Sequence, residues 1–201
     1  MMFKLFSHHK VFHMTKTNLM LLAATISMVG ITSSAIAADG TITVTGKVIN
    51  GTCTLTDSSG TANNVAIQLA TVRNTEFGAA NATTGEKAFS LTLKNGNGGD
   101  CDAVTLGAIK GITLSGTAGT HFDSANKSLL INTDASAPAT KDVYVQILNT
   151  DGTTPVDFSL TKQLGAPIDS AYALKARYIS NKASPASQTV KTSINYTLEY
   201  N

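Results

Sequence analysis

The chain is predicted to fold as an all-β sandwich, and its composition and residue pattern both indicate this class. Its 201 residues are 14% charged and 6% aromatic, contain no Trp, and are rich in Thr, Ala, Gly, Ser and Asn. Short apolar segments with a period of two residues recur along the chain, separated by turns rich in Gly and Asn, and no convincing helix interrupts them. Many short strands at regular spacing are typical of a β-sandwich with Greek-key connections.

The first 37 residues form a predicted export signal. A small positive region precedes an apolar run from Leu19 to Ile31, and Ala35-Ile36-Ala37 is an A-x-A cleavage site. Cleavage between Ala37 and Ala38 gives a mature start at Ala38, with residues 1 to 13 as an upstream extension of the signal. The apolar run is too short to span a bilayer as a stable helix.

The charge of the mature chain excludes several classes of partner. The leader holds 3 of the 15 basic residues and no acidic one, so residues 38 to 201 carry 12 basic and 13 acidic side chains, a net charge of −1. No basic patch indicates a nucleic-acid site, and no polybasic run indicates membrane-surface binding or membrane insertion. The 201 − 37 = 164 mature residues fit one domain with a substantial core.

Two cysteines, Cys53 and Cys101, remain after cleavage. Export to an oxidising compartment favours a disulfide between them. The chain-entropy model assigns roughly 4 kcal/mol to a loop of this length. Neither cysteine belongs to a CxxC pair, and metal ligation would need histidines that the mature chain lacks.

Both ends of the mature chain alternate between apolar and polar residues. Every second residue from Val190 to Tyr200 is apolar or Thr, with polar residues between them, which predicts a final strand with one dry face and one wet face. We expect another element to cover this strand, because an exposed apolar edge promotes aggregation. Residues 38 to 48 show the same period, with Ile42, Val44, Gly46 and Val48 on one face. The periodicity allows these ends to pair within one subunit or between subunits.

Several internal segments also have strand character. Val143 to Leu148 is apolar on both faces and predicts a strand buried on much of both, and Asn149-Thr150-Asp151-Gly152 is a strong turn signal after it. The other expected strands lie at 65–69, 89–93, 129–131, 156–160 and 174–178, with one or two strands and a bend within 104–115.

No constellation of residues predicts catalysis, a cofactor site or a metal site, and the chain is interpreted as a non-enzyme without a cofactor. His121 is the one histidine of the mature chain, and it has neither a nucleophile elbow nor a second metal ligand. Gly96-Asn97-Gly98-Gly99 lacks the Gly-Lys-Ser/Thr of a phosphate loop. Asn149 to Gly152 lacks the closing Glu of a calcium loop.

The chain resembles the pilins of the chaperone-usher pathway, in particular the type 1-like major fimbrial subunit. The segment from Gly40 to Cys53 is similar to that family's N-terminal extension and first cysteine, and Ala139 to Gly152 is similar to its buried strand and Asp-Gly turn. Leu174-Lys175-Ala176-Arg177-Tyr178 matches an aromatic-Ala-aromatic pattern, with Leu for the usual Phe, and Tyr200 is the penultimate residue. A Gly that the family often has about fourteen residues from the end is Gln188 here.

The resemblance implies an incomplete immunoglobulin-like Greek-key sandwich whose seventh strand is supplied in trans. Residues 38–49 would be the N-terminal donor-strand extension and 50–201 the pilin domain. The donor strand would present Gly40, Ile42, Val44, Gly46 and Val48 to a neighbouring subunit. The groove and chaperone-binding strand would consist of Val190, Ile194, Tyr196, Leu198, Tyr200 and the Asn201 carboxylate.

The same resemblance implies a structural subunit of an adhesive fimbrium, exported through the periplasm to the cell surface. Its partners would be identical or related pilin subunits, a periplasmic chaperone and an outer-membrane usher. The alternative is a minor, adaptor or sugar-binding adhesive subunit of the same kind of fibre.

Overall fold

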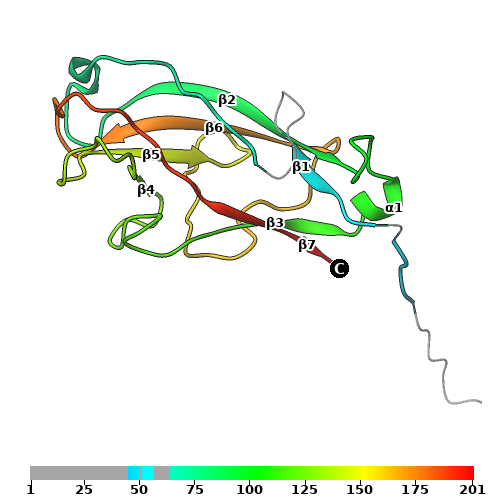
Figure 1. Ribbon diagram of the computed structural model, residues 1–201. Helices are drawn as coiled ribbons and strands as arrows, with labels where there is room; N and C mark the ends of the chain where they lie inside the picture. The colour runs from blue at the N-terminus through cyan, green and yellow to red at the C-terminus, as the bar shows by residue number, and fades with distance from the viewer. Residues whose placement is uncertain (1–44, 50, 57–63) are drawn as a thin grey trace, which may run out of the picture. The chain divides into compact units, whose positions relative to one another are not determined.

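A computed structural model describes residues 45–49, 51–56 and 64–201 (Figure 1). The predicted export signal, its cleavage site at Ala37 and Ala38, and Gly40, Ile42 and Val44 of the predicted donor strand lie outside the described residues. The described part is an antiparallel β-structure with two short helical turns, so the predicted all-β class is confirmed.

The larger sheet has five antiparallel strands in the order β1-β2-β6-β5-β4. Its strands are β1 (Thr54–Thr56), β2 (Thr83–Lys94), β4 (Leu130–Ile131), β5 (Val143–Leu148) and β6 (Ala171–Ser180). The β2 and β6 strands form the longest pairing, in which Phe89 lies opposite Leu174 and Leu91 lies opposite Tyr172. Because strand order differs from chain order, connections cross between the sheets, as expected for a sandwich.

The smaller sheet consists of β3 (Ile109–Ser115) and β7 (Asn195–Tyr200), paired antiparallel. The expected final strand is present, and the element expected to cover its apolar edge is not found among the described residues. There β7 pairs with β3 alone, so its second edge has no strand partner. Residues 190–194 are extended but belong to no strand, so β7 begins five residues later than the alternation indicates.

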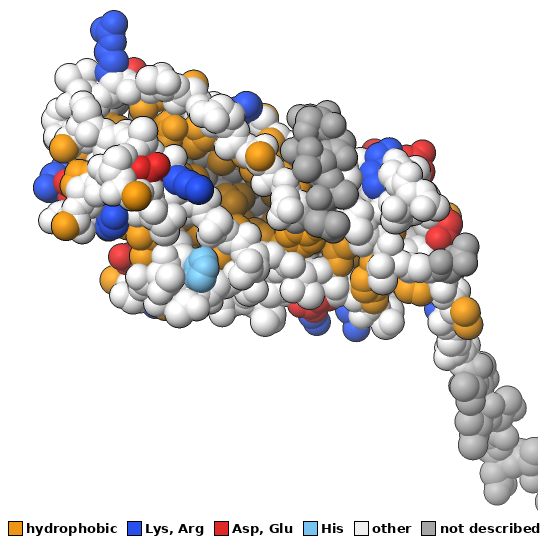
Figure 2. All heavy atoms as spheres, in the orientation of Figure 1, with side chains coloured by type: hydrophobic (Ala, Val, Ile, Leu, Met, Phe, Trp, Pro, Cys, Tyr) orange, Lys and Arg blue, Asp and Glu red, His pale blue; other side chains and the backbone are white. Residues whose placement is uncertain are grey.

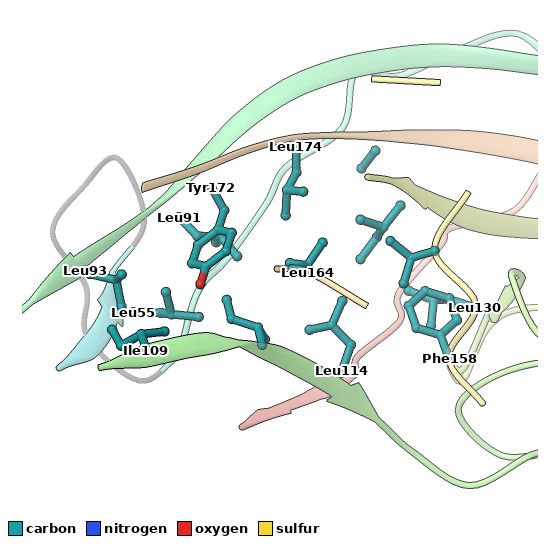
Figure 3. Close-up of a cluster of buried hydrophobic side chains, with 14 of the residues drawn as sticks. Leu55, Leu91, Leu93, Ile109, Leu114, Leu130, Phe158, Leu164, Tyr172 and Leu174 are labelled. Carbon is teal, nitrogen blue, oxygen red and sulfur yellow. The ribbon is translucent and has the colours of Figure 1, made fainter. Parts of the chain in front are cut away.

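The core lies between the two sheets, where side chains from β6 point toward β3 (Figure 3). Leu55, Leu93, Ile112 and Leu164 have 0% of their surface exposed. All six residues of β5 are buried, which confirms that this strand is covered on both faces. The turn after it is also confirmed, because Gly152 N donates to Asn149 O at 2.8 Å.

Three expectations for regular structure are wrong. The beginning of the 104–115 segment forms a short helix, α1 (Ala103–Leu106), because the Asp102 carboxylate accepts a hydrogen bond from Thr105 N at 2.9 Å and caps it. Residues 156–160 form no strand, although Val156 and Phe158 are buried. Residues 65–69 keep their alternation of burial without joining a strand ladder.

The predicted disulfide is confirmed, since Cys53 and Cys101 are bonded with their Cα atoms 6.1 Å apart. Both cysteines are buried and belong to the hydrophobic core. The bridge ties the start of β1 to the loop before α1, and therefore fixes the point at which the chain enters the sandwich.

Candidate functional site: an open apolar groove

A groove of about 980 Å³ lies between the two sheets at the end away from the disulfide. Figure 2 shows it as a hollow with apolar side chains at its bottom. Its walls are two extended segments, Asn64–Leu69 and Val190–Tyr196, neither of which is paired to the other. The floor residues come from three strands of the larger sheet and are Leu130, Val145, Ile147, Ala176 and Tyr178.

The first wall, residues 64–69, turns its apolar side chains inward. Val65, Ile67 and Leu69 are half-buried, while the residues between them are exposed. No backbone hydrogen bond to another described residue holds this segment. The Lys87 ammonium of β2 donates to Gln68 O at 2.7 Å and fastens the wall from outside. The wall therefore has free main-chain groups along the groove.

The second wall is held at its two ends, near Lys191 and where β7 begins at Asn195. The buried Asn132 side chain donates to Thr189 O at 2.8 Å and accepts from Lys191 N at 3.0 Å, and Thr133 N donates to Lys191 O at 2.7 Å. Beyond Lys191 the segment is unpaired until β7 begins at Asn195. Val190, Ile194 and Tyr196 line the groove, as the sequence predicts for three of its groove residues.

The floor contains a small residue beside a large one. Ala176 is buried, and Tyr178, two residues later on the same face of β6, is half-buried. The Tyr178 ring lies against Gly85, where a Cβ atom would come 2.9 Å from the ring, and Gly85 has a φ of +65° in a bulge of β2. Burial raises the pKa of the Tyr178 hydroxyl. The floor is therefore uneven, deeper at Ala176 than at Tyr178.

The remaining predicted groove residues lie at the closed end of the sandwich and do not line the groove. Leu198 and Tyr200 are half-buried and pack against the core. Cys53 N donates to the Tyr200 hydroxyl oxygen at 2.9 Å, which links the last strand to the disulfide. Asn201 is exposed, and its backbone N donates to Ala108 O at 2.8 Å.

The described part of the predicted extension lies at this closed end. Thr45 to Ile49 have no regular structure, and Val48 is 95% exposed. The Lys47 ammonium donates to Gly107 O at 3.0 Å, at the C-terminal end of α1. A Cβ atom added at Gly46 would meet no neighbouring atom within 4 Å, so the segment makes few contacts with the sandwich.

The polar groups of the described residues form no catalytic arrangement. Nδ1 of His121 accepts a hydrogen bond from Thr117 N at 2.9 Å, which gives the side chain a role in its own loop. No group of three His, Cys, Asp or Glu side chains within the described ranges is placed to hold a metal ion. In the same ranges, no helix has the length and hydropathy of a membrane span.

Comparison with known proteins gives two curated relatives. The chain is 28% identical over 175 residues to the F17 fimbrial protein of Escherichia coli, covering 84% of this chain and 91% of the relative. It is 32% identical over 120 residues to the major fimbrial subunit SMF-1 of Stenotrophomonas maltophilia, covering 57% of this chain and 59% of that subunit. No family model matches the chain.

Comparison with solved structures gives two further alignments. A Burkholderia pseudomallei antigen and type I fimbria protein aligns with a TM-score of 0.39 and 24% identity, over 76% of this chain and 86% of that one. A subunit from the structure of a chaperone-usher pilus aligns with a TM-score of 0.46 and 12% identity, over 82% of this chain and 96% of that one.

The described residues form a β-sandwich with one disulfide and an apolar groove that no described strand fills, which is the geometry of an incomplete sandwich. The chain is similar in sequence to two proteins that are named as fimbrial subunits.

Half of the groove was missed by sequence reasoning. The alternating residues Val65, Ile67 and Leu69 were interpreted as an ordinary strand, whereas they form an unpaired wall. The pattern shows which side chains turn inward, but a half-buried strand looks the same whether or not a neighbour completes its hydrogen bonds. The floor residues come from strands that the sequence predicts. They lie together because these strands are neighbours in the larger sheet, and the sequence pattern does not reveal that strand order.

Proposed function

We propose that this chain polymerises by donor-strand exchange, in which the extension at residues 38–49 of one copy fills the groove of another. The observation that carries the proposal is a groove bounded on both sides by extended backbone without a strand partner. A strand laid between the two walls would hydrogen-bond to both of them and would cover the apolar floor. An unfilled groove of this size on an exported protein invites nonspecific association.

The side chains of the extension suit the shape of the floor. Ile42 and Val44 supply branched apolar groups for the deeper part of the groove, whose floor is Ala176. Gly46 would pass where the floor is raised by the Tyr178 ring, since a glycine needs no socket. Gly40 and Val48 would occupy the two ends of the inserted segment.

The direction of the chain favours insertion between copies. Because Cys53 is held beside Tyr200, the extension leaves the sandwich near the C-terminal end of β7. If it turned back into its own groove, residues 38 to 48 would run parallel to residues 190 to 200. An extension from another copy is free to enter antiparallel, and antiparallel pairing is slightly more stable per residue.

The same groove supports transient binding of a periplasmic chaperone before assembly. The unpaired edge of β7 and the apolar floor suit a β-strand inserted by the chaperone. The exposed Asn201 carboxylate suits an ion pair with a basic side chain of the chaperone. We accordingly place the subunit in a surface fimbrium that supports bacterial attachment, reached through the periplasm and an outer-membrane usher.

Deletion of residues 38–48 tests the proposal. The shortened chain should fold, since the described residues among those removed, 45–48, are exposed and lie outside the core. It should bind a peptide of residues 38–49 without forming polymers. Wild-type fibres should give a ladder of oligomers on an unheated denaturing gel that collapses on boiling, because exchanged strands dissociate extremely slowly. Polymers formed by the deletion variant would contradict the mechanism.

A further inference from the structure

We infer that the Thr192 hydroxyl is a specificity-determining group of the groove and donates a hydrogen bond to a main-chain carbonyl of the inserted strand. The inference rests on the proposed function and adds one directional polar contact to a groove that is otherwise recognised by its apolar shape. The expected occupant is the extension of a second copy of this chain.

Thr192 interrupts an otherwise apolar row. Val190, Ile194 and Tyr196 line the groove on the same face of the second wall, and Thr192 lies between the first two. Its Oγ1 atom is shielded from solvent and has no hydrogen-bond partner among the described residues. A buried hydroxyl without a partner destabilises the folded subunit, whereas a valine of nearly the same shape would avoid this cost.

Other threonines of this chain make the hydroxyl-to-carbonyl hydrogen bond that Thr192 lacks. The hydroxyl of Thr54 donates to Lys94 O at 3.3 Å, and that of Thr56 donates to Thr92 O at 3.2 Å, in each case to the residue opposite on the paired strand. The Thr133 hydroxyl donates to Lys191 O at 3.1 Å across the gap to the second wall. Thr192 has the same donor on an extended segment, but the described structure places no strand beside it.

Two other buried polar atoms without partners do not share this setting. Oδ1 of Asp142 belongs to a carboxylate whose other oxygen is paired with Lys182 at 2.8 Å. The Tyr172 hydroxyl is enclosed in the core at the closed end. Neither residue lines the groove, so Thr192 is the partnerless group that a strand entering the described groove would reach.

The isosteric variant Thr192→Val gives the decisive comparison. The probe is a synthetic peptide of residues 38–49, added to monomeric chain that begins at Ala38. Removing the unpaired hydroxyl should raise the thermal midpoint of the free subunit. Removing a hydrogen bond of the filled groove should speed peptide dissociation by about fivefold to tenfold. If the role of Thr192 were purely structural, a substitution that raises the thermal midpoint of the free subunit would also slow peptide dissociation.

Two further variants serve as controls. Thr192→Ser keeps the hydroxyl and loses a methyl group, so it should lower the midpoint of the free subunit and retain slow dissociation relative to the valine variant. Thr197→Val changes an exposed threonine of β7 and should leave peptide dissociation unchanged.

The outcomes separate this inference from the proposed function. A wild-type subunit that does not bind the peptide would overturn the proposed function and the inference with it. A wild-type subunit that binds, with Thr192→Val dissociating at the same rate or more slowly, would overturn only the role of Thr192. Faster dissociation from a more stable free subunit is the result that we expect.

Discussion

The two ends of the sandwich differ in how the last strand is held. At the closed end, the Tyr200 hydroxyl accepts a hydrogen bond from Cys53 N, the disulfide fixes Cys53, and Leu55 is fully buried. At the open end, Val190 to Ile194 face a groove with no described strand beside them. One apolar face of alternating residues therefore serves two purposes: its C-terminal half completes a core, and its N-terminal half offers a binding site.

This difference separates stability from assembly. Substitutions at the closed end remove contacts that the free subunit already makes, so they should lower its free energy of unfolding. Substitutions at the open end remove contacts that form only when the groove is filled, so they should act on strand binding.

Leu55→Ala should have the largest effect, because it leaves a cavity in the fully buried part of the core. The expected loss in the free energy of unfolding is about 2–5 kcal/mol, measured by denaturant titration with the disulfide intact. The matched open-end variant Ile194→Ala should cost less, because Ile194 is already half-exposed along the groove. Equal losses at the two positions would contradict the division.

Tyr200→Phe should have an intermediate effect. It removes the hydroxyl that accepts from Cys53 N and leaves that N–H without this partner, at an expected cost of about 1–3 kcal/mol in the free energy of unfolding. Tyr196→Phe is the control on the same strand, since its hydroxyl makes no hydrogen bond to a described residue. A Tyr196→Phe subunit as destabilised as the Tyr200→Phe subunit would argue against a special role for the closed end.

Tyr172→Phe should have the smallest effect at neutral pH and a visible one in alkali. Burial, with a smaller contribution from Tyr200, raises the pKa of Tyr172 from 10.0 to about 12. The folded state therefore resists ionisation of this hydroxyl, so the associated stability is fully present below pH 10 and is lost as the pH rises from 10 to about 12.

Thermal melts across this range should show a shallower decline for Tyr172→Phe than for wild type. Part of the decline should persist, because burial also raises the pKa values of Tyr144 and Tyr178. Identical curves for the two proteins would indicate that Tyr172 ionises as readily in the folded state as in the unfolded state.

The fold class, the disulfide and the inward faces of most strands could be predicted from the sequence. The alternation from Val190 to Tyr200 shows which side chains turn inward, and two cysteines leave one pairing within the chain. These features depend on the local alternation of residues or on the number of cysteines. They need no knowledge of which strands become neighbours.

Strand partners could not be predicted in the same way. Residues 65–69 and 190–194 have the pattern of paired strands, yet neither joins a strand ladder among the described residues, because pairing depends on whether another segment lies within hydrogen-bonding distance. The Asp102 cap that starts α1 was also missed, since four helical residues carry too little periodicity to be seen.

Amide hydrogen exchange along the two walls tests the central claim most directly. In the free subunit, amides within 65–69 and 192–194 should exchange rapidly, because no described strand pairs with them. Addition of the 38–49 peptide should slow alternate amides on both walls by at least about 100-fold, and should leave β5 unchanged. Slow exchange of both walls before the peptide is added, or no change afterwards, would contradict the account.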